Sequence, residues 1–364
     1  MNIIEQKELI NNKNYNAVDI AKFICSIMVV MIHVPPFGRG SEMLVSESVE
    51  YAFCSCLCRI AVPFFFICSG FLLYKKTSSA DFSFSPTKKY ALNLFRLYVI
   101  WSVIYFPLCY IIDFKDKKTG SAVIQYIRNF IFSGSYEHLW YLTATVFAVI
   151  VISLLLKKAV SPEKIAAAAA FLYLIGLLAQ SWFGVIAPLK ELTPSLWSAL
   201  KITKNVIVTT RNGLFEGVLF VGIGMLFSKY QFRIPLKKSL LLFCASVCLL
   251  LIEAFTLKHY GFVRQCDMYL FSVPVATFGF SFAAQIKLPD KPIYKKLRKL
   301  SSLIYFSHPL INKIVGIPLG IIYKPLCDSA LRFIITVIAS VVFSLIIIKL
   351  SELPKLKLLK KLYS

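Results

Sequence analysis

The stretch Asp19-Ile-Ala-Lys22-Phe-Ile-Cys-Ser26-Ile-Met-Val-Val-Met-Ile-His33 decides the fold class of this chain. It is an apolar run that carries an acid, a base and an imidazole. At about 100° per residue, the four numbered side chains fall within roughly 60° of one another on a helix, over about 21 Å of its length. Polar groups inside a bilayer are costly, so such a stripe is typical of a helix that faces a bundle interior or a wet cavity. The stretch predicts a membrane helix that contributes to a functional site.

The composition extends this prediction to the whole chain. Of its 364 residues, 58% are apolar, and Phe (31) and Tyr (18) are abundant, as in membrane proteins with aromatic belts. The mean hydropathy is +0.71. A net charge of +23 would suggest nucleic acid as the partner of a soluble protein, but here the charges lie mostly in short loops between apolar runs. Membrane topology explains such loops. We therefore expect the lipid bilayer as a partner and no nucleic acid.

Because a span needs roughly 20 apolar residues, we expect an all-α integral membrane protein with about ten transmembrane helices. The expected spans are 17–38, 50–74, 90–112, 138–156, 164–183, 206–228, 238–258, 267–286, 299–321 and 328–350. The chain then divides into an N-terminal segment, 1–16, a transmembrane domain, 17–350, and a basic tail, 351–364. The N-terminal segment lacks the order of a cleavable signal peptide, so we expect the first helix to be retained as a signal anchor.

Basic loops set the expected orientation. Lysine and arginine residues gather in alternate loops and in the tail. The positive-inside rule places these loops and both termini in the cytoplasm, in agreement with an even number of spans. Lys115, Lys117 and Lys118 are exceptions to this pattern, because their loop is expected on the non-cytoplasmic side. We expect a multi-pass protein of the cell membrane, with a bacterial plasma membrane as its setting.

This orientation divides the polar residues of the spans into two groups. A basic cytoplasmic mouth would contain Asp19, Lys22, Lys89 and Arg96. A histidine-containing vestibule toward the outside would contain His33, Arg59, His138, Arg211, Glu216 and, near mid-depth, His308. Trp140 and Tyr141 follow His138 and would line an entrance for an acceptor.

Several motifs occur in one order along the whole chain. They are Asp19-x-x-Lys22 followed by His33, Arg59-Ile-Ala-Val-Pro63-Phe-Phe-Phe-Ile-Cys-Ser69-Gly70-Phe71-Leu, Arg96-Leu-Tyr-Val-Ile-Trp101, Glu137-His138-Leu-Trp140-Tyr141-Leu142, Arg211-Asn212-Gly213-Leu-Phe-Glu216-Gly217 and Ser301-Ser-Leu-Ile-Tyr305-Phe-Ser-His308-Pro309. Together they resemble the acyltransferase-3 family of integral membrane O-acyltransferases. The chain also resembles the membrane half of vancomycin-resistance serine racemases, which belongs to the same family.

The resemblance implies an activity. Family members modify extracytoplasmic glycans with acetyl or other acyl groups, which come from acyl-CoA bound from the cytoplasm. It implies that His33 is catalytic and that Arg96 contacts the donor, with acetyl-CoA as the expected co-substrate and no metal. Two positions depart from the family's pattern, because Leu92 stands where a first arginine is expected and Lys22 replaces the arginine after the aspartate. Lys88 or Lys89 would have to supply the missing charge.

The residues themselves favour the same chemistry. Acyl transfer to a sugar hydroxyl needs a base for the hydroxyl proton and charge near the oxyanion. Imidazole titrates near neutrality, which makes His33 the natural base, with His138 and Glu216 as further catalytic candidates. The alternative is that His33 only bonds a neighbouring helix, but its polar stripe favours function. Asp19 is too distant along the helix to orient His33.

Several of these residues also have structural interpretations. Asp19 is expected to form a pair with Lys22 or Arg96, and such a pair could be purely structural. Lys89 could bind CoA phosphates or could be an ordinary positive-inside residue.

Trp140 and Tyr141 are equally typical of interfacial anchors. His308 precedes Pro309 and could satisfy a carbonyl freed by a kink. Arg211 and Glu216 are five residues apart, so we expect each to find partners on other helices.

The sequence therefore predicts an O-acyltransferase that moves an acyl group, with acetyl expected, onto a hydroxyl of a cell-envelope or exported glycan. The donor would bind at Lys22, Lys89 and Arg96, and the acceptor would enter between His33 and His138. The alternative is a transporter of a small solute such as serine. The sequence contains no zinc motif, Walker loop or dinucleotide fingerprint.

Overall fold

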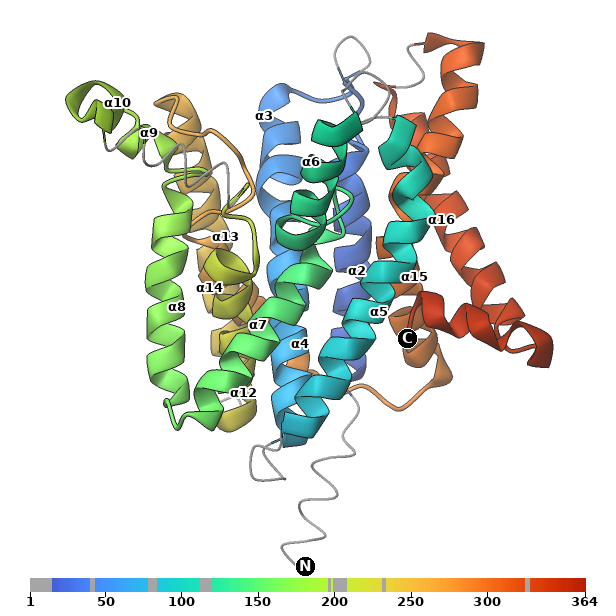
Figure 1. The fold of residues 1–364 in the computed structure, drawn as a ribbon, viewed down its shortest axis with the longest axis horizontal. Helices are drawn as coiled ribbons and strands as arrows, with labels where there is room; N and C mark the ends of the chain where they lie inside the picture. The colour runs from blue at the N-terminus through green and yellow to red at the C-terminus, as the bar shows by residue number, and fades with distance from the viewer. Residues whose placement is uncertain are drawn as a thin grey trace, which may run out of the picture.

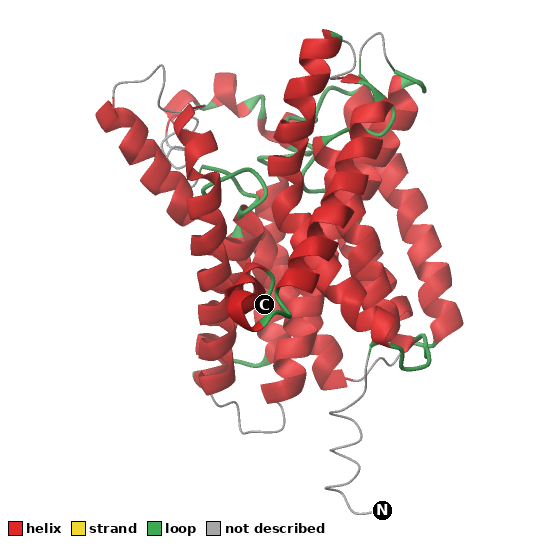
Figure 2. Cartoon of the chain, turned by 90° about the vertical axis from the view of Figure 1, so that its right-hand side faces the viewer, coloured by secondary structure: helices red, strands yellow, loops and turns green. Residues whose placement is uncertain are grey.

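A computed structural model describes residues 15–39, 43–77, 84–111, 119–195, 198, 208–230, 234–324 and 328–364. These residues form helices joined by loops, and none of the described residues is in a strand (Figure 1, Figure 2). The all-helical prediction is confirmed. Segment 1–16 lies almost wholly outside the described residues, as do Lys115, Lys117 and Lys118.

Eleven longer helices build the described part of the bundle. They are α2 (Asn16–His33), α4 (Ala61–Thr77), α5 (Phe84–Cys109), α6 (Thr119–Phe132), α7 (Trp140–Lys157), α8 (Pro162–Leu177), α12 (Val218–Tyr230), α13 (Leu236–His259), α14 (Ser272–Gln285), α15 (Pro292–Ile322) and α16 (Ala330–Leu350). Shorter helical pieces are α3 (Glu47–Glu50), η2 (Tyr51–Cys56), η3 (Leu57–Ile60), α9 (Phe183–Ile186), α10 (Leu189–Leu192), η5 (Gly213–Gly217) and η7 (Pro354–Leu362).

Seven described segments are long and apolar enough to cross a membrane. They are Asn16–His33, Glu47–Lys75, Phe84–Cys109, Trp140–Lys157, Gly213–Tyr230, Leu236–His259 and Ala330–Leu350. They indicate a multi-pass membrane protein. The other three expected spans are also helices, namely α8, α14 and α15. With 16 and 14 residues, α8 and α14 fall short of the roughly 20 residues of an ordinary span, and α15 starts with a cluster of basic residues.

α4 and α12 approach each other closely in the centre of the bundle. A Cβ atom at Gly70 would stand 2.1 Å from the carbonyl oxygen of Val221, and one at Gly224 would stand 2.2 Å from that of Ile67. Only glycine permits two backbones to come this near, as in other small-residue contacts between membrane helices. The two glycines therefore fix the position of α4 in the bundle.

Two helices of the bundle begin with irregular turns. The span that contains α4 starts as α3, passes through the π-helical turn η2 and the 3-10 turn η3, and becomes regular only at Ala61. α12 begins with the π-helical turn η5, where the side-chain oxygen of Asn212 accepts the amide protons of Leu214 and Phe215. π-Helical turns are frequent at functional sites. Here the two irregular stretches carry Arg59 and Glu216.

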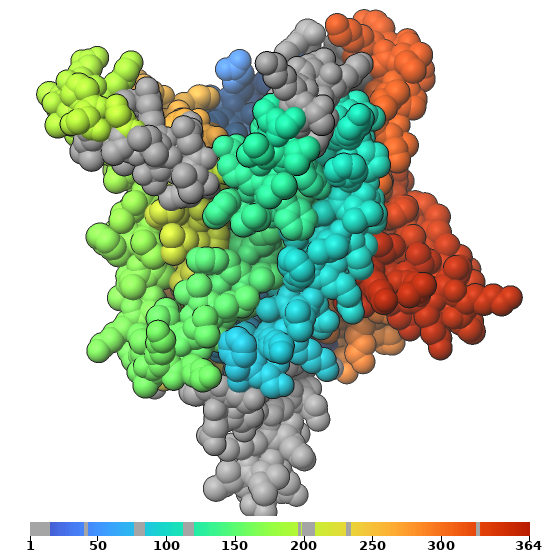
Figure 3. All heavy atoms as spheres, viewed as in Figure 1, coloured from blue at the N-terminus to red at the C-terminus, as the bar shows by residue number. Residues whose placement is uncertain are grey.

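The C-terminal helix η7 is held against α5. The indole Nε1 of Trp101 donates a hydrogen bond of 3.0 Å to the carbonyl of Leu362, and Nη2 of Arg96 donates one of 2.6 Å to the carbonyl of Ser364. Figure 3 shows this last, red part of the chain standing out at the right-hand edge of the molecule. The basic tail expected from the sequence is thus mostly helical.

Candidate functional site

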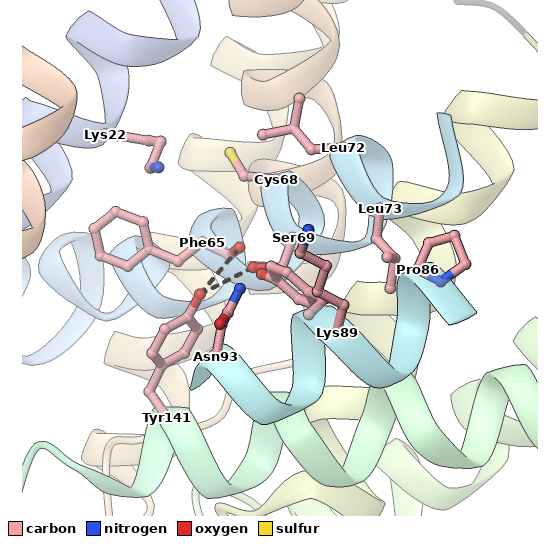
Figure 4. Close-up of a pocket in the computed structure, with 11 residues that line it drawn as sticks. Lys22, Phe65, Cys68, Ser69, Leu72, Leu73, Pro86, Lys89, Asn93 and Tyr141 are labelled. Carbon is pink, nitrogen blue, oxygen red and sulfur yellow. Dashed lines mark hydrogen bonds between the residues drawn. The ribbon is translucent and has the colours of Figure 1, made fainter. Parts of the chain in front are cut away.

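A cavity of about 490 Å³ lies among α2, α4, α5 and α7 (Figure 4). It is lined by Lys22, Phe65, Cys68, Ser69, Leu72, Leu73, Pro86, Lys89, Tyr90, Asn93 and Tyr141. We call it the lysine cavity. Its volume falls within the range of about 300–1,000 Å³ that is common for small-molecule sites. Two ammonium groups on its lining make it suited to an anionic ligand.

The part of α5 that lines the lysine cavity is one helical face. Pro86, Lys89, Tyr90 and Asn93 follow the spacing of 3, 4 and 7 residues that places side chains together. Arg96, expected beside Lys89, is exposed and is not among the lining residues. Its guanidinium group is hydrogen-bonded to the end of the chain, because η7 lies alongside that part of α5.

Asp19 is buried and forms an ion pair with Arg298 of α15. Nε of Arg298 donates to Oδ1 at 2.8 Å and Nη2 donates to Oδ2 at 2.6 Å, so the guanidinium fork holds both carboxylate oxygens. The expected pairing of Asp19 with Lys22 or Arg96 is therefore wrong. The reason is that α15 packs along α2, and Ser301 of α15 also donates to the carbonyl of Lys22 at 2.9 Å.

A second, smaller cavity of about 40 Å³ adjoins the other end of α2. It is lined by Val29, Ile32, His33, Arg59, Val62, Glu137, His138, Trp140, Arg211, Glu216, Asp267 and Tyr305. We call it the histidine cavity. The structure thus brings together five residues that the sequence placed in one vestibule, His33, Arg59, His138, Arg211 and Glu216, with Trp140, which was expected at the acceptor entrance. His308, also expected in the vestibule, is not among the lining residues. Tyr141, expected beside Trp140, lines the lysine cavity instead.

His33 has an acidic neighbour in the loop before α7. Its Nδ1 atom lies 3.4 Å from Oε2 of Glu137. The hydrogen bond from His33 is the main reason why the pKa of the Glu137 carboxyl lies below its ordinary value. His33 also lines a further cavity of about 20 Å³ with Arg39, Asp328 and Arg332, so it borders two spaces at once. Glu137 can therefore orient the imidazole, a role that Asp19 is too distant to fill.

His308 stabilises a proline kink in α15. Pro309 lacks an amide proton, which frees the carbonyl of Tyr305. Nδ1 of His308 lies 2.9 Å from this oxygen and 3.1 Å from the carbonyl of Ile304. Both neighbours are acceptors, so Nδ1 carries the proton, and in the neutral ring Nε2 is an acceptor. The structural role considered for this residue is confirmed.

Three imidazole rings form a row beside the histidine cavity. The ring centroid of His308 lies 5.2 Å from that of His33 and 5.4 Å from that of His138. His138 is buried, and neither of its ring nitrogens has a hydrogen-bond partner among the described residues; the same is true of Nε2 of His308. Buried polar atoms normally have partners, so these nitrogens are available to a ligand or water. No group of three or more described His, Cys, Asp or Glu side chains is placed to hold a metal ion.

The histidine cavity is also lined by charged residues. Asp267 accepts hydrogen bonds from Arg59 and from Arg211, the latter at 3.1 Å. The guanidinium of Arg211 also lies 5.0 Å from the ring centroid of Trp140. Glu216 is buried, and its Oε2 atom has no hydrogen-bond partner in the described part of the chain. The arrangement places two cations and a buried carboxyl group around one small space.

Sequence reasoning assigned no role to four residues of these sites. Asp267 is a lone acid at the start of an expected span, and that position was the signal that could have identified it. Glu137 and Tyr305 lie inside the motifs quoted above, next to or near a histidine. Arg298 gave no signal beyond its place in a basic loop, because nothing in the sequence links it to Asp19.

Comparisons with known proteins show similarity over most of the chain. A profile of the acyltransferase domain family matches residues 15–349. An amino-acid racemase of Enterococcus faecalis is 27% identical over 341 residues, which cover 93% of this chain and 46% of that protein. A serine/alanine racemase of Enterococcus gallinarum is 31% identical over 304 residues, which cover 80% of this chain and 40% of that protein. The chain thus spans less than half the length of these relatives. No solved structure matches it.

Proposed function

The chain belongs to the acyltransferase-3 family, and from this premise we propose that it is a membrane O-acyltransferase. It moves an acyl group, most simply acetyl, from cytoplasmic acyl-CoA to a hydroxyl of an extracytoplasmic or exported glycan. The observation that carries this proposal is the separation of two sites along α2. Lys22, near the start of the helix, lines the lysine cavity, and His33, at its end, lines the histidine cavity.

The lysine cavity is the proposed donor site. The ammonium groups of Lys22 and Lys89 neutralise phosphate, and Ser69 and Asn93 add polar contacts. The volume of about 490 Å³ accommodates part of a CoA molecule, and the remainder extends past Lys89 and Asn93, which are exposed. The proposal does not rely on Arg96 or Asp19, because both are engaged in contacts outside the lining.

The histidine cavity is the proposed place of transfer. His33, oriented by Glu137, removes the proton from the acceptor hydroxyl as its oxygen attacks the thioester carbonyl. The new C–O bond forms, the C–S bond breaks, and the departing CoA thiolate takes up a proton. Arg59 and Arg211 stabilise the oxyanion that forms in between. His138 and Glu216, whose buried atoms lack partners, bind the acceptor or relay its proton.

The proposed orientation places the lysine cavity toward the cytoplasm. Basic residues occupy the helix ends near this cavity, including Lys88 and Lys89 at the start of α5 and Lys157 at the end of α7. The positive-inside rule then assigns that side to the cytoplasm, and the histidine cavity to the side of the envelope. This assignment also retains ten spans and two cytoplasmic termini in a bacterial plasma membrane.

The test compares envelope polysaccharides from cells with and without this chain by mass spectrometry. Loss of one defined mass, about 42 Da for an acetyl group, would identify both the acyl group and the acceptor. The same mass should return with the wild-type chain and not with a folded His33→Ala variant. Identical polysaccharide masses in all strains would contradict the proposal.

A second candidate is the movement of a small amino acid such as serine across the membrane. The likeness to a serine/alanine racemase favours it, as do two cavities at opposite ends of one helix. Uptake of labelled serine into proteoliposomes without acyl-CoA would support this candidate. Uptake that needs no donor, together with unchanged envelope masses, would replace the acyltransferase proposal.

A further inference from the structure

Three aromatic rings in mutual contact connect the lining of the lysine cavity with that of the histidine cavity. Phe65 and Tyr141 line the lysine cavity, whereas Tyr305 lines the histidine cavity. The ring centroid of Tyr305 lies 5.8 Å from that of Phe65 and 5.6 Å from that of Tyr141, and the latter two are 5.9 Å apart. Each ring therefore contacts the other two. We call this triangle the aromatic wall.

The two tyrosines of the aromatic wall are fixed at their hydroxyl groups. The hydroxyl of Tyr141 lies 3.0 Å from that of Ser69 on α4, as Figure 4 shows by a dashed line. The hydroxyl of Tyr305 donates a hydrogen bond of 2.5 Å to the carbonyl of His138. The Phe65 side chain has no polar group and is held by packing, whereas the backbone carbonyl of Phe65 accepts a hydrogen bond of 3.4 Å from the Tyr141 hydroxyl. A change at Phe65 thus alters the wall without removing a hydrogen bond.

The two cavities differ in what they can contain. A space needs at least about 10–15 Å³ of this measure to hold one water molecule. The histidine cavity, at about 40 Å³, therefore has room for roughly three water-sized groups. An acetyl group has three heavy atoms, its carbonyl carbon and oxygen and its methyl carbon. A longer acyl chain has additional carbons. These carbons would not fit in the histidine cavity and would have to lie among the three rings of the aromatic wall.

We propose that Phe65, Tyr141 and Tyr305 determine the acyl specificity of this protein, because their aromatic wall admits a two-carbon acyl group and rejects longer chains. This inference rests on the proposed acyltransferase function. In the filtered reaction, the thioester C–S bond breaks and a C–O bond to the acceptor forms. The hydroxyl proton passes to His33 and from His33 to the departing CoA thiolate, which restores the base. The aromatic wall restricts the length of the carbon chain that is attached to the thioester carbonyl.

The experiment compares Phe65→Leu with Phe64→Leu in the full-length protein. Phe64 is the matched control, because it precedes Phe65 on α4 and is equally buried, at 5% against 6% exposure. Its ring packs on Phe280, 5.8 Å away between centroids, and it lines neither cavity. Release of the CoA thiol is measured with acetyl-CoA, butyryl-CoA and hexanoyl-CoA, in proteoliposomes supplied with envelope polysaccharide.

The wild type and Phe64→Leu should use acetyl-CoA at least about tenfold faster than butyryl-CoA, the scale on which a pocket discriminates added methylenes. Phe65→Leu should raise the ratio of the butyryl rate to the acetyl rate about tenfold, whatever its effect on the acetyl rate alone. Phe65→Met, whose unbranched side chain adapts to irregular space, is the second variant if Phe65→Leu does not fold. It should raise the ratio of the butyryl rate to the acetyl rate in the same direction.

Three results would overturn this inference, and the third would overturn the proposed function as well. A wild type that uses butyryl-CoA as fast as acetyl-CoA would show that the wall filters nothing. Identical chain-length profiles for Phe65→Leu and Phe64→Leu, with acetyl transfer intact, would remove the filter and leave the proposed function standing. Failure of the wild type to release thiol from every donor would instead overturn the proposed function, and the filter with it.

Discussion

The lysine cavity and the histidine cavity present their charges differently. The lysine cavity is about 490 Å³ in volume, and its cations are single ammonium groups on half-buried or exposed side chains. The histidine cavity is about 40 Å³, and its two guanidinium groups share one half-buried aspartate, Asp267. Several of its buried nitrogens and oxygens lack partners among the described residues.

The difference suggests how the two regions divide the work. Flexible ammonium groups around a large space suit a sizeable anion that binds and leaves. Fixed charges and unpartnered polar atoms around a small space suit a developing charge, because they need no rearrangement during the reaction. Changes in the histidine cavity should therefore affect the rate and the fold, whereas changes in the lysine cavity should affect donor binding.

The largest effect is expected from His33→Gln. Loss of a general base typically lowers the rate by about 10²–10⁴-fold, and the KM for acetyl-CoA should stay the same because His33 does not line the lysine cavity. Initial rates over a range of donor concentrations measure both quantities. A variant with near-normal turnover would remove His33 from the reaction.

Asp267→Asn should cost the most stability. It leaves Arg59 and Arg211 side by side without that carboxylate. The Asp267 side chain is 13% exposed, so the free energy of unfolding should fall by less than the about 3–5 kcal/mol typical of a fully buried ion pair. Denaturant titration of the purified protein in detergent measures this. Glu163→Gln is the control, because its pair with Lys229 is exposed and such surface pairs contribute little to stability. Equal losses in both variants would argue against a charge network built around Asp267.

Glu137→Gln should change the pH dependence of the rate. The pKa of the Glu137 carboxyl is lower in the folded protein than in the unfolded chain. The carboxylate therefore stabilises the fold at a pH above the unfolded pKa. This contribution is lost as the pH falls through the folded pKa. Near pH 6 the carboxylate is therefore charged, and its Oε2 atom lies 3.4 Å from Nδ1 of His33. Removal of this carboxylate should move the acid limb of the rate profile to lower pH, by about one unit or less.

Rates between pH 5 and pH 8 measure this shift, with Glu47→Gln, at the exposed start of α3, as the control. An acid limb that stays in place or moves to higher pH would show that Glu137 does not act on His33.

Arg96→Gln should have the smallest effect. Its guanidinium group contacts the carbonyl of Ser364 and not the lysine cavity, so the KM for acetyl-CoA should change by less than about twofold. Loss of the hydrogen bond should lower stability by about 1 kcal/mol. A large rise in KM would restore Arg96 to the donor site that the sequence predicted.

The sequence revealed which residues face the interior but not which residues they meet. The stripe on α2 and the motifs grouped Lys22 with Lys89 and His33 with His138, and the structure places these pairs at two cavities. Periodicity and span orientation are enough for that, because they give the face and depth of each side chain.

Long-range partners could not be predicted in this way. Asp19 meets Arg298, which is 279 residues away, and Arg96 meets Ser364, which is 268 residues away. Such contacts depend on which helices are neighbours, and no local pattern encodes that. The Asp267 pairing was missed for the same reason, since Arg59 and Arg211 come from two other segments of the chain.

Direct donor binding distinguishes the two cavities best. The measurement is equilibrium binding of a non-transferable acetyl-CoA analogue, with the thioester sulfur replaced by methylene, to the purified wild type, to Lys22→Met/Lys89→Met and to His33→Gln. The double lysine variant should bind about tenfold or more weakly, since two phosphate contacts are lost, whereas His33→Gln should bind like the wild type. Normal binding by the lysine variant, or equal loss in both variants, would contradict a donor site separate from the site of transfer.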